Sequence, residues 1–187
     1  MISTALQMRK FLADITKAVS ETVELPADPR DLFEAVCAAV GKLQGKKVVL
    51  RLAPFPDGTS SGVLLDFADK SLVVIEERTS DEHKLVILGH ELWHAKAGHC
   101  SHDASGAAMA ARMLSEGEPD WEALAPRLLA VAARTGFAEY DENEAEKFGL
   151  RVAQTFRTWM TGPHARGPLR TDTVENRMSA SLEYRGQ

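Results

Sequence analysis

His90-Glu91-Leu92-Trp93-His94 is the stretch from which both the architecture and the chemistry of this chain are predicted. Two histidines four residues apart lie on one face of an α-helix, so both imidazoles can reach a single zinc ion. Glu91 lies about 100° around that helix from the first histidine, where it can take a proton from water beside the metal. The segment therefore predicts a helix with His90 and His94 as zinc ligands and Glu91 as the general base.

The residues around this segment favour a helix rather than a chance occurrence of the pattern. Asp81 and Glu82 suit a first helical turn, the apolar run 85–88 can pack in a core just before the motif, and Gly98 suits the C-terminal end of the helix. We therefore expect the helix to begin near Ser80.

The composition bounds the class of protein. With 187 residues, of which 44% are hydrophobic, the chain can build one sizeable core. Lys and Arg number 22 against 27 Asp and Glu, without a dense basic block, which argues against direct nucleic-acid binding. Cys37 and Cys100 form no CxxC pair, and no apolar run approaches about 18 residues. We therefore expect a soluble protein of the reducing cytoplasm that does not span a membrane.

The pattern of apolar residues and chain breakers predicts an α+β fold. Helices are expected over 5–20, from 31 to Gly41 or Gly45, and over 81–98, 104–116, 119–135 and 138–160, and strands over 46–52, 63–67 and 72–75. The last two strands suit a hairpin, so the helices should pack around a small, mainly antiparallel three-stranded sheet. Residues 1–160 would form one domain with an insert at 101–136, followed by an extended or loosely packed tail over 161–187.

A catalytic zinc site needs a third protein ligand while one position stays open. The candidates are His99, His102 and an acidic cluster of Glu139, Asp141, Glu142, Glu144 and Glu146. On the last helix, positions 142, 145, 149, 152, 156 and 159 form a stripe in which a carboxylate precedes two small residues. Small residues let this helix approach the motif helix closely, as a metal ion shared between two helices requires. Glu142, the carboxylate at the start of the stripe, is therefore the predicted third ligand. Its alternative role is a charge that favours the helix dipole.

Two other residues stay open as third ligands. Glu144 projects roughly 110° from the centre of the stripe and is the reserve candidate. His99 follows Gly98, which ends the motif helix, and a chain that folds back there would give a three-histidine site. The competing interpretation is that His99 caps the helix or hydrogen-bonds a ligand. Trp93 is expected to pack in the core, and His83 to be solvated.

From about Leu32 to Phe156 the chain resembles the ImmA/IrrE family of zinc metallopeptidases. The segment from Val86 to His94, followed by Gly98-His99, is similar to that family's "ftlaHElgHxxlGH". The family's later Glu-x-x-Ala-x-x-Phe pattern is met by Glu142, Ala145 and Phe148. The resemblance implies a gluzincin-like metallopeptidase that cleaves a helix-turn-helix repressor, as in mobile-element control, stress response or toxin–antitoxin pairs.

The chain departs from the family after this pattern, because Phe148-Gly149-Leu150-Arg151-Val152-Ala153 leads to no Met-Pro. It also has no convincing fused DNA-binding module, so a regulator would be a separate protein. We expect a zinc endopeptidase of narrow specificity acting on a cytoplasmic helix-turn-helix regulator. One alternative is a non-catalytic regulator or toxin-type partner that acts by binding, and another is a zinc hydrolase of a non-peptide substrate. Residues 101–136 could either cover the cleft or form a packed helical pair.

Overall fold

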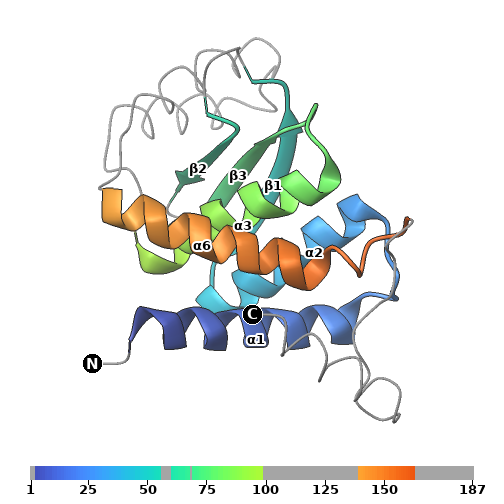
Figure 1. Ribbon diagram of the computed structural model, residues 1–187, viewed down its shortest axis with the longest axis horizontal. Helices are drawn as coiled ribbons and strands as arrows, with labels where there is room; N and C mark the ends of the chain where they lie inside the picture. The colour runs from blue at the N-terminus through green and yellow to red at the C-terminus, as the bar shows by residue number, and fades with distance from the viewer. Residues whose placement is uncertain (1–2, 56–59, 68, 99–138, 163–187) are drawn as a thin grey trace, which may run out of the picture.

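The computed structural model describes residues 3–55, 60–67, 69–98 and 139–162. Its elements, in chain order, are α1 (Thr4–Thr22), α2 (Pro29–Gln44), β1 (Lys47–Ala53), β2 (Gly62–Asp66), β3 (Lys70–Glu76), α3 (Asp81–Ala97) and α6 (Glu139–Phe156). The described helices pack against a small mixed sheet, so the expected α+β class is confirmed (Figure 1). The helices expected over 104–116 and 119–135, the insert, and the tail beyond residue 162 lie outside the described residues.

The motif helix α3 has the ends that the sequence predicts. The Ser80 side chain accepts a hydrogen bond from the His83 backbone N–H at 3.3 Å, which caps the first turn. Gly98 follows the last turn with φ 73°, in the left-handed region that favours glycine. Gly45 ends α2 in the same way with φ 68°. Ser80 and Gly98 therefore set the two ends of α3.

The sheet has the strand order β1-β3-β2. The predicted hairpin is confirmed, because β2 pairs antiparallel with β3, with Leu65 opposite Leu72. The expectation of a mainly antiparallel sheet is wrong for the other pair, because β1 runs parallel to β3 over its whole length. The chain leaves β1 and returns at the far edge as β2, which puts β3 in the centre. Residues 71–75 of β3 are accordingly buried on both faces.

The main core lies between the helices and one face of the sheet. Val48, Leu64, Val73 and Ile75 face this core from the three strands. The most extensive contact between two helices joins α3 and α6, which cross each other above α1 (Figure 1). Because α3 also packs on β2 and β3, this helix lies between the sheet and α6.

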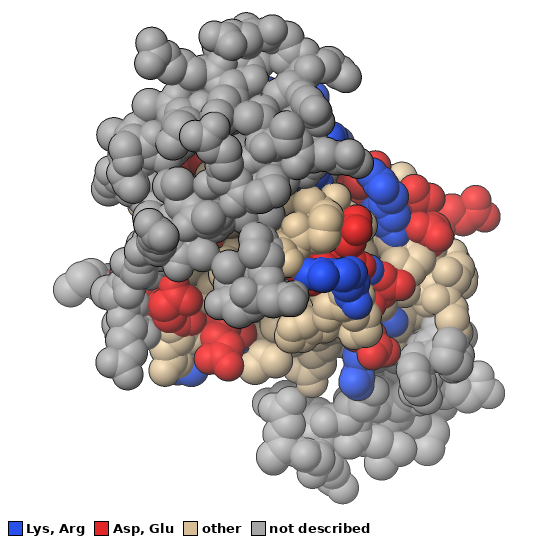
Figure 2. Space-filling view, turned by 90° about the horizontal axis from the view of Figure 1, so that it is seen from above, with Lys and Arg blue, Asp and Glu red and all other residues tan. Residues whose placement is uncertain are grey.

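The described surface has mixed charge. On the face in Figure 2, blue Lys and Arg side chains are interspersed with red Asp and Glu side chains, and the described atoms show no continuous basic patch there. Among the described residues, no helix has the length and apolar character needed to cross a bilayer.

Candidate metal centre

His90 and His94 lie on successive turns of α3, on the same face of the helix. The Nε2 atoms of His90 and His94 lie 3.1 Å apart, and their rings meet edge to face with centroids 4.8 Å apart. The His94 side chain is 1% exposed, whereas the His90 side chain is 26% exposed. The pair therefore has a buried side at His94 and an open side at His90.

α6 supplies a carboxylate to the same point. Glu142 Oε2 lies 3.4 Å from His90 Nε2, and Glu142 Oε1 lies 3.5 Å from His94 Nε2. One ligand atom from each of the three residues lies within 4.8 Å of the others. The Glu142 side chain is 42% exposed, so the group opens to solvent between Glu142 and His90.

The spacing of these donor atoms fits a tetrahedral metal ion. Zinc–ligand bonds of about 2.0–2.1 Å at tetrahedral angles place neighbouring donor atoms about 3.3 Å apart. The distances of 3.1, 3.4 and 3.5 Å between the imidazole and carboxylate atoms bracket that value. Two imidazoles and one carboxylate could therefore hold a divalent ion, with a fourth position left for water or substrate.

Glycines on both helices allow this close approach. A Cβ atom on Gly149 of α6 would lie 2.4 Å from the Val86 carbonyl oxygen of α3, and one on Gly89 would lie 2.8 Å from the Gly149 Cα. The predicted stripe is buried around this contact, as Ala145 and Val152 are both 0% exposed. The small residues thus let α6 lie against α3 where Glu142 reaches the histidines.

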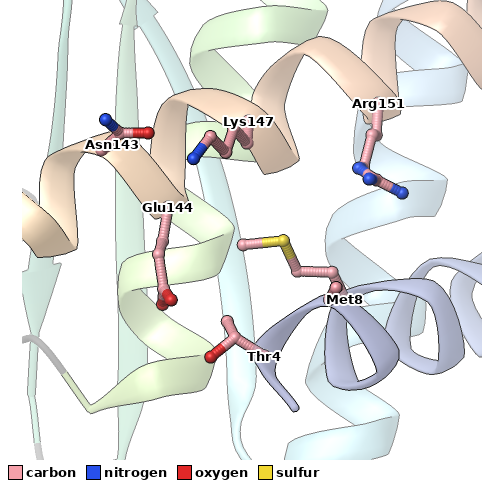
Figure 3. Close-up of a pocket in the computed structure, with 7 residues that line it drawn as sticks. Thr4, Met8, Asn143, Glu144, Lys147 and Arg151 are labelled. Carbon is pink, nitrogen blue, oxygen red and sulfur yellow. The ribbon is translucent and has the colours of Figure 1, made fainter.

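Glu144, one of the two reserve candidates, does not lie at this point. Glu144 lines a groove of about 540 Å³ between α1 and α6, together with Thr4 and Lys147. Figure 3 shows the Glu144 carboxylate directed toward Thr4 of α1. The metal-ligand group found among the described residues therefore contains Glu142 and not Glu144. His99 lies outside the described residues.

Glu91 is buried next to the group formed by His90, His94 and Glu142, and it packs against β2. It is 7% exposed, and a Cβ atom on Gly62 would lie 2.8 Å from its Oε1 atom. Burial and the nearby charge of Glu142 raise the pKa of Glu91 to about 8, while a backbone hydrogen bond from Leu64 opposes the rise. The carboxyl group is thus held by the strand edge and is within electrostatic reach of the ligand group.

The environment of His90 favours the form that binds metals. Burial lowers the pKa of His90, although the charges of Glu142 and Glu146 oppose that shift. A neutral imidazole is the ligand form of histidine, so partial burial lowers the proton competition for a metal ion.

The contribution of β2 to the site was not predicted from the sequence. Gly62 begins that strand, and a glycine in a strand often marks the close approach of another group, which was the available signal. The expected packing of Trp93 and exposure of His83 are confirmed. Trp93 packs against Phe11 and Phe148, with ring centroids 6.5 and 5.1 Å away, and His83 is exposed.

No protein-family model matches the chain, and no curated protein and no solved structure matches it at a significant level. The resemblance to the ImmA/IrrE family therefore rests on the motifs in the sequence, and the function is a proposal drawn from the site.

Proposed function

We propose that this protein is a zinc-dependent metallo-endopeptidase, with His90, His94 and Glu142 as zinc ligands and Glu91 as the general base. The observation that carries the proposal is the donor spacing of 3.1 to 3.5 Å with a buried glutamate beside it. Two imidazoles, one carboxylate and an adjacent base form the set of groups used by zinc hydrolases of the HExxH type.

The residues of the chain divide the chemical work among them. Zinc, when bound, supplies Lewis acidity that activates water and polarises a carbonyl group. Glu91 takes the proton of the attacking water and returns it to the leaving amine.

The position of Glu91 favours a peptide as the substrate. β2 is an edge strand, and within the described residues its outer edge pairs with no other strand. An extended peptide can add to such an edge through main-chain hydrogen bonds. Because Gly62 and Leu64 of β2 contact Glu91, a peptide on this edge would pass beside the base. A cytoplasmic helix-turn-helix regulator is the proposed protein substrate, on the motif resemblance alone.

The test compares wild type with Glu91→Gln at equal zinc occupancy, using a native protein extract of the source organism. New N-termini are identified and timed by mass spectrometry, with chelator-treated wild type as the zinc control. We expect cleavage by wild type and a rate lower by about 10²–10⁴-fold in Glu91→Gln, the usual contribution of general-base catalysis. Equal rates in the two proteins would refute the mechanism. If neither cleaves but both retain the same partner protein, the binding-protein alternative replaces the peptidase.

A further inference from the structure

Glu76 holds both ends of the connection between β1 and β2. Its carboxylate Oε2 accepts a hydrogen bond from the Phe55 backbone N–H at 2.8 Å. Its own backbone N–H donates to the Ser61 carbonyl oxygen, also at 2.8 Å. Phe55 precedes the connection and Ser61 leads directly into β2, so this one residue at the end of β3 ties down both sides.

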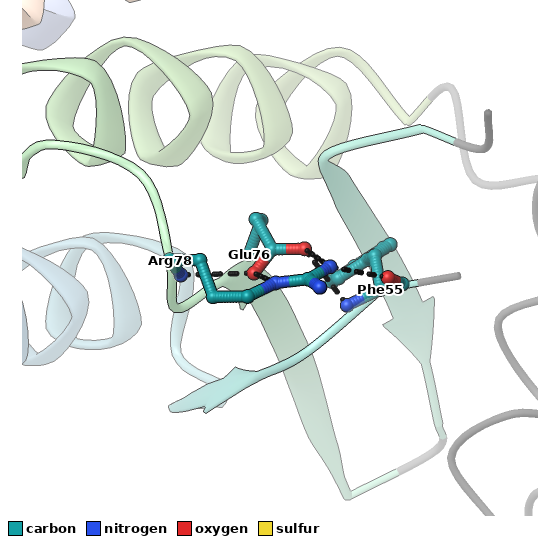
Figure 4. A network of polar contacts seen from close by, with 3 residues as sticks. All are labelled: Phe55, Glu76 and Arg78. Carbon is teal, nitrogen blue, oxygen red and sulfur yellow. Dashed lines mark hydrogen bonds and ion pairs between the residues drawn. The ribbon is translucent and has the colours of Figure 1, made fainter. Parts of the chain in front are cut away.

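Arg78 also binds Phe55. Its Nη2 atom donates to the Phe55 carbonyl oxygen at 2.6 Å and to Glu76 Oε2 at 2.8 Å (Figure 4). Its Nε atom and backbone N–H both donate to Glu76 Oε1, at 2.9 and 2.8 Å. The N–H and C=O groups of Phe55 are thus both bound by one ion pair, in which the Glu76 side chain is only 13% exposed. Several charge-assisted hydrogen bonds at one point give a rigid attachment.

This attachment lies one residue from the contact between β2 and Glu91. Gly62 follows Ser61, and a single added methyl group there would meet Glu91 Oε1 at 2.8 Å and Ile87 Cγ2 at 2.4 Å. Leu64, two residues further, donates its backbone hydrogen bond to Glu91. A small shift at the start of β2 would therefore change both contacts that orient this carboxylate.

We propose that Glu76 and Arg78 are positioning residues for the general base: their ion pair fixes Glu76 against Phe55, and the Glu76 backbone N–H in turn holds Ser61 at the start of β2, which orients Glu91. This inference rests on the proposed peptidase function. Neither residue belongs to the metal-ligand group found among the described residues, so the proposed effect on Glu91 passes through Ser61 and β2.

The other end of β2 offers a matched control. Lys46 Nζ and Ser71 Oγ each lie 2.5 Å from Asp66 Oδ1, so an ion pair with a hydroxyl partner fixes this end of the hairpin. Asp66→Asn removes a carboxylate charge at the end of β2, and Glu76→Gln removes one at the end of β3, next to the start of β2. Both variants should lose stability, but only Glu76→Gln should disturb Glu91.

The first experiment measures backbone amide exchange at Leu64 by NMR in wild type, Glu76→Gln and Asp66→Asn. We expect Leu64 protection to fall at least about tenfold in Glu76→Gln, beyond any change that is uniform over the sheet, because its hydrogen bond to Glu91 is weakened. In Asp66→Asn it should change only as much as the rest of the sheet. Equal local effects in the two variants, or none in either, would overturn the inference, and this readout does not depend on activity.

The second experiment asks whether Glu76 acts through Glu91. In the extract assay at equal zinc occupancy, Glu76→Gln should cut the fastest-cleaved site about tenfold to 10²-fold more slowly, the range for a small misplacement of a catalytic group. In a Glu91→Gln background the same substitution should cause no further loss. Additive losses would make Glu76 merely structural. If Glu76→Gln does not fold, Arg78→Lys keeps the charge but not the planar fork and takes its place.

The two proposals fail in different ways. A wild type that shows no zinc-dependent cleavage refutes the peptidase, whatever Leu64 exchange shows. The positioning role alone is refuted if wild type cleaves, Glu91→Gln is inactive, and Glu76→Gln keeps both full activity and normal Leu64 exchange.

Discussion

The Gly149 Cα hydrogen faces the carbonyl oxygen of Val86 so closely that a Cβ atom there would lie 2.4 Å from that oxygen. Backbone atoms of α6 and α3 are therefore in contact two turns after Glu142 and one turn before His90. This contact sets the separation of the two helices, and with it the distances from Glu142 to the two histidines. The geometry of the candidate metal centre thus depends on a residue that has no side chain.

Gly149→Ala should weaken both the fold and the metal site. The added methyl group forces the helices apart, at a cost of about 1–3 kcal/mol for overpacking, which outweighs the gain in helix propensity of about 1 kcal/mol. Zinc affinity should fall because Glu142 moves from the histidines. Urea unfolding and competition with a zinc chelator measure the two effects. Leu150→Ala, at an exposed neighbour, is the control and should change stability by only about 0.5 kcal/mol. Unchanged zinc affinity in Gly149→Ala would contradict this role.

Local patterns in the sequence predicted the helices of the site well. Ser80 and Gly98 are local signals for the ends of α3, and the stripe containing Ala145 and Gly149 is a local signal for a face of α6. Because both metal-site helices carry such signals, His90, His94 and Glu142 could be grouped from the amino-acid sequence alone.

The sheet could not be predicted in the same way, because strand pairing depends on residues far apart in the sequence. β1 and β2 follow each other in the chain, yet β3 lies between them and pairs parallel with β1. The contact of Gly62 and Leu64 with Glu91, and the ion pair that ties Phe55, follow from this arrangement. No periodicity within a single segment encodes those contacts.

The stability of the protein should fall in acid partly through Glu76. Hydrogen bonds from Arg78 lower the pKa of Glu76 from 4.5 to about 2. Ionised Glu76 therefore stabilises the fold above pH 4.5, and this contribution is lost as the pH falls from 4.5 toward 2. Glu76→Gln should be less stable than wild type near neutral pH, and the difference should shrink in that window. Urea unfolding across this range tests it, with the exposed ion-pair residue Glu34 changed to Gln as control. A constant difference at all pH values would contradict the assignment.

Glu91 should show the opposite dependence in zinc-stripped protein. Its pKa is raised from 4.5 to about 8, so folding favours the protonated form, and its contribution to stability falls as the pH rises from 4.5 to 8. Glu91→Gln removes this penalty. Its free energy of unfolding relative to wild type should therefore increase between about pH 5 and pH 8. Parallel stability curves for the two proteins would show that Glu91 is not held in a buried, poorly solvated position.

Zinc binding by the Glu142 and Glu144 variants tests the central claim most directly. We expect wild type to bind about one zinc per chain, His94→Ala to bind none tightly, and Glu142→Gln to bind at least about tenfold more weakly than wild type. Glu144→Gln, whose carboxylate faces α1, should bind zinc as wild type does. Competition titrations with a chromogenic chelator give all four affinities in one buffer. Wild-type affinity in Glu142→Gln, or full zinc retention after both motif histidines are changed to alanine, would contradict the metal centre described here.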